Sequence, residues 1–242
     1  MNDSVPVIPL TRLALAFLPV GLVLLIIHRW SLGTRTAVVA VLRMVSQLLL
    51  VGYVLTFIFG SHQAVITLAV ISLMLAVAGW IALRPIPDER VPRYPAVLIA
   101  ISLGALSVLT LVTQGVLRLE PWHEASVVIP LGGIVLANSM NTVSLAAERF
   151  SSERRRGASY REARHIAMST ALIPMTNSLL AVGLVSLPGM MTGQILSGVT
   201  PLIAVRYQLL VMCMIFGAAG LATASYLLLL RPATTRDEEN SR

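Results

Sequence analysis

The chain contains no lysine, because all eighteen of its basic residues are arginine. A P-loop ATPase needs its lysine to hold the nucleotide phosphates, so the chain has no ordinary Walker A site of its own. The single cysteine, Cys213, cannot form an intrachain disulfide, and we expect it to be a small buried residue. The motifs of zinc metalloproteases and serine hydrolases are absent too, which argues against an enzyme.

Acidic residues are missing from the interiors of the long apolar runs, and the four histidines lie in loops or near the ends of those runs. A carrier that is driven by protons usually relays them through an ionisable group inside the membrane. The distribution of acids and histidines therefore argues against proton-driven transport.

Hydrophobic residues make up 56% of the 242 residues and charged residues only 12%, a composition too apolar for a soluble domain. Runs of about the 20 residues that cross a bilayer fall at 9–27, 36–59, 64–83, 96–116, 127–147, 166–187 and 206–230. We therefore predict an all-α, polytopic membrane protein with about seven transmembrane helices. The permease-like membrane domain covers 1–231, and 232–242 is expected to be a disordered cytoplasmic tail. The first run has no basic segment ahead of it and no cleavage site behind it, so we expect a retained helix.

Arginines are concentrated in alternate loops, and basic residues in short loops stay on the cytoplasmic side. If the N-terminus is outside, the outer segments hold only Arg12 and Arg118. This predicts an N-out, C-in orientation. The net charge of +7 then needs no nucleic acid as a partner, because the inner surface faces anionic membrane lipids.

The segment 171–208, ALIPMTNSLLAVGLVSLPGMMTGQILSGVTPLIAVRYQ, is long enough to cross a bilayer but contains residues that break helices. Pro174 has no amide proton for the helix, and Pro188 with Gly189 can unwind the chain just beyond Leu187. In hydrocarbon, freed backbone groups must find partners in neighbouring helices or in a water-lined cavity. The interruptions therefore indicate a path or a gate.

Polar side chains within the apolar runs point to the same region. Arg43 and Gln47 lie one helical turn apart in the second run, although Arg43 is also close enough to the membrane surface to snorkel. Asn138 and Asn141 lie in the fifth run and Asn177 in the sixth. Such groups either bond between helices or line a pathway. Because a polar fifth run precedes a broken sixth run, we predict that these five residues line a transport path.

Methionines and an amide near the predicted break complete this set. We place Met190, Met191 and Gln194 near an outer gate of the path. Thioether sulfurs suit soft or borderline metals, but methionine also fills irregular gaps in packing. The sequence assigns no metal ligands, and both interpretations of the methionines stay open.

A basic segment at 148–169 connects the fifth and sixth runs. Gly157 breaks its arginine cluster, and Ser159 precedes Glu162 by three residues, which is the spacing of a capping box. We expect a short helix at the inner surface that enters the sixth run near Ile166. A basic loop attracted to lipid headgroups is the alternative.

The segment 171–208, with its core SLPGMMTGQI, resembles the FetB-type iron-export ABC transporter permeases, a family that includes plant aluminium-sensitivity permeases. Further matches are RMVSQLLLVGYVLTFIF at 43–59 and IPLGGIVLANSMNTVSL at 129–145. The resemblance implies a homodimeric permease in the bacterial inner membrane, driven by a separate cytoplasmic ABC ATPase subunit. ATP and Mg²⁺ would bind to that partner, and this chain would bind no cofactor.

The family carries a loop motif of the L-G-A-x-x-x-x-A type, which the resemblance implies docks on the ATPase. It corresponds here to the segment from Arg156, which replaces the leucine, through Gly157, Ala158, Ser159, Glu162 and Ala163. The loop is about a dozen residues shorter than usual. The implied function is iron export. A nucleotide sugar or another small solute, an ATP-independent carrier or channel, and a non-transporting scaffold remain the alternatives.

Overall fold

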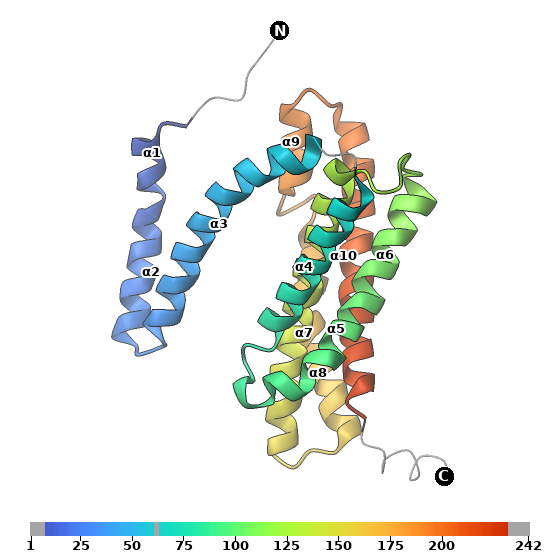
Figure 1. Cartoon of the computed structure of the whole chain (residues 1–242). Coiled ribbons are helices and arrows are strands. Elements are labelled where there is room, and N and C mark those ends of the chain that lie inside the picture. The colour runs from blue at the N-terminus through green and yellow to red at the C-terminus, as the bar shows by residue number, and fades with distance from the viewer. Residues whose placement is uncertain (1–7, 61–62, 232–242) are drawn as a thin grey trace. The chain divides into compact units, whose positions relative to one another are not determined.

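Every named element in residues 8–60 and 63–231, which the computed structural model of the chain describes, is a helix (Figure 1). The all-α prediction is therefore confirmed for these residues, whereas the predicted tail at 232–242 lies outside them. The chain divides into two units, Met1–Gly60 and Ser61–Arg242.

The described residues of the first unit form three helices. The helices α1 (Leu10–Leu15) and α2 (Phe17–Arg29) follow each other closely, and α3 (Thr34–Gly60) returns against α2. Most of the apolar side chains described in this unit are exposed. Such surfaces are stable in hydrocarbon, because lipid tails are as apolar as the side chains that face them.

The second unit is a helical bundle with α7 at its centre, where it packs against α4, α8 and α10. The π-helical turns η2 and η3 flank the short helix α6. In chain order the elements are α4 (Ala64–Ala82), η1 (Pro87–Glu89), α5 (Arg90–Ile101), η2 (Ser102–Leu106), α6 (Ser107–Thr110), η3 (Leu111–Val116), α7 (Ala125–Arg155), α8 (Tyr160–Ala181), α9 (Gly189–Leu196) and α10 (Pro201–Leu229).

Small residues let η2 and α10 approach closely. A Cβ atom built on Gly104 would lie 2.4 Å from the backbone nitrogen of Ala222 and 2.7 Å from the carbonyl oxygen of Ala218. Ala218 and Ala222 are fully buried. Close backbone contact of this kind drives helix association in membranes, where there is no hydrophobic effect between helices.

Six helical stretches of the described residues are long and apolar enough to cross a membrane: Thr11–Arg29, Thr34–Leu55, Ala64–Ala82, Pro87–Val116, Ala125–Arg155 and Pro201–Leu229. They match six of the seven predicted runs. The remaining run overlaps α8, whose apolar part at 166–181 covers about 24 Å at ~1.5 Å per residue, less than a hydrocarbon core of about 30 Å. The molecule is a multi-pass membrane protein, while the count of seven and the orientation stay predictions.

The break in the sixth run lies earlier than the sequence predicted. Pro174 sits inside α8 without ending it, and the helix stops at Ala181, before Leu187. Gly183 then takes a φ of +84°, which glycine adopts at little cost, and the amide of Val185 turns back to the carbonyl of Ala181 at 2.8 Å. The prediction that the chain unwinds just beyond Leu187 is therefore wrong, because the chain already leaves the helix at this turn, six residues earlier.

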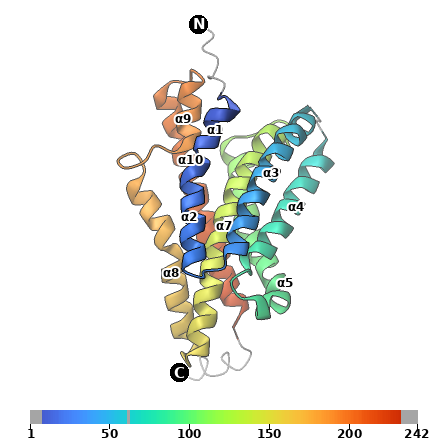
Figure 2. The same cartoon turned by 90° about the vertical axis from the view of Figure 1, so that its left-hand side faces the viewer.

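The connection between α7 and α8 is a tight turn at 156–159, and the helix that follows it is the long α8 and not the short helix that we expected (Figure 2). The capping box itself is confirmed, since the Ser159 Oγ accepts a hydrogen bond from the Glu162 amide at 3.2 Å. The helix that starts there meets no glycine or proline before Pro174, so it continues as α8.

Two smaller features complete the fold. The proline-rich segment 84–95 is not a turn throughout, because α5 begins within it at Arg90 and includes Pro95. Pro92 lies in the first turn of α5, where the amide it lacks has no helical partner, whereas Pro95 lies inside the helix. Cys213 is exposed on α10, not buried.

Candidate functional site

A cavity of about 70 Å³ lies among α7, α8 and α10. Each of the three helices contributes polar or sulfur-containing groups to its wall. The lining residues are Asn138, Met175, Ser178, Leu179, Met212, Ile215 and Phe216.

A larger cavity of about 320 Å³ follows along the same groove between α7 and α10, nearer to α9. Ile134 in its wall lies one helical turn from Asn138, and Val211 is next to Met212 of the smaller cavity. The two cavities therefore lie one after the other along one groove between α7 and α10. The larger one is lined by Leu117, Ser126, Val127, Pro130, Leu131, Ile134, Met190, Tyr207, Leu210 and Val211.

Asn138 is the predicted path residue that lines the smaller cavity. Its side-chain Nδ2 donates to the carbonyl of Ile134 at 2.8 Å, while its Oδ1 accepts no hydrogen bond from the described residues. One turn further, the Thr142 Oγ1 donates to the Asn138 carbonyl at 3.1 Å and reaches the Ala219 carbonyl of α10 at 3.5 Å. The amide is thus held on α7 with its acceptor atom available to a ligand in the cavity.

Asn141 and Asn177 are not part of the walls of these two cavities. Asn141 lies exposed on α7 and Asn177 lies exposed on α8. Arg43 and Gln47 lie exposed on α3, in the first unit. Lipid cannot satisfy such polar groups at membrane depth, so they need water or protein partners.

The helix α9 carries the predicted gate residues. Met190 lines the larger cavity, and Met191 is half-buried beside it. The Gln194 Oε1 is buried without a hydrogen-bond partner among the described residues. A buried hydrogen-bond acceptor without a partner destabilises the folded state. This end of the groove is therefore suited to a rearrangement, or to a bound polar group, that supplies a donor.

The predicted coupling residues form the α7–α8 turn. Gly157 has a φ of +91° and open space around it, and the carbonyl of Ala158 accepts from the Arg154 Nη1 at 2.8 Å. Glu162 is exposed beside Ser159, whereas Ala163 is fully buried. The turn therefore presents Gly157 and Glu162 outward while Ala163 anchors the start of α8 in the bundle.

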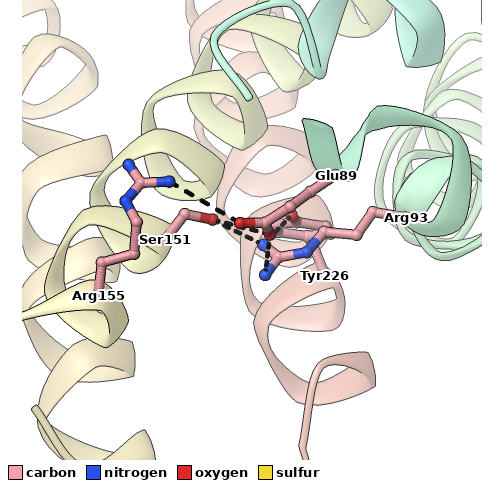
Figure 3. Close-up of polar contacts among 5 residues, drawn as sticks. All are labelled: Glu89, Arg93, Ser151, Arg155 and Tyr226. Atoms are coloured by element: carbon pink, nitrogen blue, oxygen red, sulfur yellow. Dashed lines mark hydrogen bonds and ion pairs between the residues drawn. The ribbon is translucent and has the colours of Figure 1, made fainter. Parts of the chain in front are cut away.

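A polar network ties the same end of α7 to η1, α5 and α10 (Figure 3). Arg93 pairs with Glu89 one turn before it, and its Nη1 donates to the Ser151 Oγ at 2.9 Å and to the Tyr226 Oη at 3.3 Å. The Ser151 Oγ donates to the Glu89 Oε2 at 3.2 Å, and Arg155 lies 3.9 Å from Glu89. We call these five residues the Arg93 network.

A second contact fixes α8 to α10 near this network. The Tyr160 hydroxyl donates to the Leu227 carbonyl at 2.7 Å, in a fully buried position. In the sequence Arg93 is one of many arginines, and no pattern assigns a role to Tyr160. The spacing of Glu89 and Arg93, four residues apart, is the signal that could have revealed a helix and an ion pair there.

The family model of the Uncharacterised protein family (UPF0014) matches residues 10–234, which include the groove, α9 and the α7–α8 turn. The chain belongs to the UPF0014 family. It is 34% identical over 228 residues to the probable iron export permease protein FetB of Escherichia coli, covering 87% of this chain and 86% of FetB. This finding confirms the resemblance to FetB-type proteins.

Two other relatives, from a cyanobacterium and a plant, match most of the chain as well. The UPF0014 membrane protein slr1647 of Synechocystis is 34% identical over 232 residues, covering 80% of this chain and 87% of the relative. Protein ALUMINUM SENSITIVE 3 of Arabidopsis thaliana is 30% identical over 200 residues, covering 75% and 71%. No solved structure matches the chain.

Proposed function

We propose that this UPF0014 chain is the membrane-embedded permease subunit of an exporter that is powered by a separate cytoplasmic ABC ATPase. The observation that carries the proposal is the exposed α7–α8 turn, which is capped by Ser159 and joined to the bundle by the Arg93 network. The absence of lysine supports the division of labour, since this chain lacks the residue that a Walker A site requires.

The contacts of the turn offer a mechanical route from the ATPase to the groove. α7 and α8 are continuous helices from the turn to the cavities, so a displacement at the turn moves both walls. The Arg93 network and the Tyr160 hydroxyl link the same end to α10, the third wall. Repacking of these helices would open the groove alternately to the two sides of the membrane.

The name of FetB supports iron as the exported solute in this family. We extend that function to this chain, with two permease copies and the ATPase subunits assembled in the bacterial inner membrane. In this scheme ATP and Mg²⁺ bind to the ATPase subunit, and the permease binds no resident cofactor. It catalyses no chemical step, and the groove with Asn138 and Met190 is the route of the solute.

Reconstitution of the full chain with its ABC ATPase subunit in lipid vesicles tests this proposal. We expect ATP-dependent flux of iron, followed with radioactive Fe²⁺, and ATP hydrolysis that continues in the Gly157→Trp variant while flux falls about fivefold or more. Val65→Trp, at an exposed position on α4 away from the turn, is the matched control and should transport normally.

The Gly157→Asn variant separates docking from backbone strain, because asparagine tolerates positive φ better than most side chains do. We expect it to retain coupled flux. Flux by this chain alone, without an ATPase, would favour a carrier or channel. Normal coupling in Gly157→Trp would contradict the role of the turn.

A further inference from the structure

We propose that the 70 Å³ cavity among α7, α8 and α10 binds a soft monovalent metal ion of the cuprous type, through Met175, Met212 and Asn138. The inference goes beyond the proposed export of iron, because it assigns to this part of the groove a soft monovalent ion in addition to the iron named above. Ser178 lines the same cavity and adds a hydroxyl oxygen.

The donor set selects the metal. Met175 comes from α8 and Met212 from α10, so thioether sulfurs reach the cavity from two different helices. Thioethers are soft ligands that favour Cu(I) over hard cations, which prefer carboxylate and water oxygens. Asn138 supplies one neutral oxygen from α7. A site of this composition is poorly suited to Mg²⁺ or Ca²⁺.

The absence of negative charge favours a single positive charge on the ion. In the described residues there is no group of three or more His, Cys, Asp or Glu side chains that could hold a metal. A cation at membrane depth must lose much of its hydration, and that cost rises with the square of its charge. Neutral ligands therefore suit a monovalent ion better than a divalent one.

The oxygen of Asn138 is oriented by its other contacts. Because its Nδ2 donates to the Ile134 carbonyl at 2.8 Å, the amide plane is fixed and Oδ1 remains as an acceptor without a partner in the described residues. Secondary contacts of this kind commonly hold metal ligands in position. Thr142 anchors the same turn of α7 through its contacts to Ser139 and Ala219.

The volume of the cavity limits what it can bind. A water molecule needs about 10–15 Å³ of such volume, so 70 Å³ accommodates an ion with a few waters. Pockets for drug-sized ligands are about 300–1,000 Å³, so this cavity alone is small for a solute of that size. The neighbouring cavity of 320 Å³ contains the further thioether of Met190 and leads toward α9.

Packing is the competing explanation for the two methionines, since their flexible side chains fill irregular spaces. Leucine has a similar volume and no sulfur, so Met→Leu changes usually preserve packing. Loss of metal binding with an unchanged fold would therefore identify the sulfurs as ligands. Met214 is a matched control, because it lies on α10 but is buried in the core and is not part of the cavity wall.

Silver ion, a soft monovalent probe, tests the site in the purified full chain by equilibrium dialysis in detergent without chloride. The Cys213→Ser background is needed because Cys213 is exposed next to Met212 and its thiol is itself a soft ligand. We expect saturable binding of about one Ag⁺ per chain, and affinity about tenfold or more weaker in Met175→Leu/Met212→Leu. Met214→Leu should bind as the parent does.

Equal Ag⁺ binding by the double variant and the parent, or no Ag⁺ binding by the parent, would overturn the proposal. Tighter binding of Fe²⁺ than of Ag⁺ at the same methionines would also overturn it. Thermal unfolding of each variant checks that the fold is kept, and Asn138→Leu provides an independent loss of one ligand. The flux and ATP hydrolysis of the Gly157 variants use no Ag⁺, so failure here is distinguishable from failure of the proposed function.

Discussion

The two ends of the bundle in the second unit are constructed differently. At the hairpin end, residues 150–165, the Arg93 network and the buried Tyr160 hydroxyl join elements that are distant in the sequence. At the α9 end, residues 182–199, the helix α9 contains no buried residue and Gln194 lacks a partner for its Oε1 among the described residues. The hairpin end is therefore suited to move as one body, and the α9 end is suited to change its conformation.

The glycines follow the same division. The α9 end has two residues in the left-handed region, Gly183 at φ +84° and Gly198 at φ +89°, on either side of a short helix. The hairpin end has only Gly157 among its described residues. Segments with few buried contacts open with low free energies, which is where gates are found.

The largest effect should come from separating η2 from α10, which connects the two ends. Gly104→Leu would place a side chain where even a Cβ lies 2.4 Å from the Ala222 nitrogen, so we expect a loss of more than about 4 kcal/mol or failure to fold. Expression and thermal unfolding in detergent measure this. Gly115→Leu, whose Cβ would meet only Leu111 at 3.6 Å, is the control and should fold.

The stability of the hairpin end should depend on the Arg93 network. Arg93→Ala removes hydrogen bonds to Ser151 and Tyr226 and leaves Glu89 without its nearest partner. We expect a loss of about 1–3 kcal/mol, measured by thermal unfolding. Arg156→Ala removes an exposed guanidinium and leaves Glu153 paired with Arg149, so it should change stability by less than about 0.5 kcal/mol. Equal losses in both variants would show that the Arg93 network stabilises the hairpin end no more than a peripheral ion pair does.

The smallest effect is a difference in dynamics in the unaltered chain. Backbone amides of 182–199 should exchange with deuterium about tenfold faster than those of 150–165, because fewer buried contacts hold them. Mass spectrometry of the chain in detergent measures the exchange by segment. Faster exchange at 150–165 than at 182–199 would contradict the assignment of the gate to the α9 end.

The fold class and most helices could be predicted from the sequence, because hydrocarbon requires long apolar helices. The capping box at Ser159 and Glu162 was also predictable, since it depends on residues three apart. The end of α8 could not be predicted. Pro174 is tolerated within the helix, while the turn at Gly183 is stabilised by backbone hydrogen bonds to Ala181. Glycine and proline residues in a run indicate that the helix is interrupted, but they do not indicate at which residue it ends.

The candidate site was predicted only in part, for a physical reason. Asn138 and Met190 stand out as unusual residues near a broken helix, and the structure places both in walls of the groove. Met212 and Ser151 do not stand out, because their roles depend on helices that meet only in the folded chain. The Arg93 network likewise joins residues up to 133 positions apart.

The exposed position of Cys213 on α10 gives the chain a natural reporter. It is the sole thiol, so a nitroxide attached there marks one point per molecule without any engineered residue. Dipolar spectroscopy measures the distance between two such nitroxides. It would show whether two copies associate and whether the distance between their α10 helices changes when ATP is replaced by ADP.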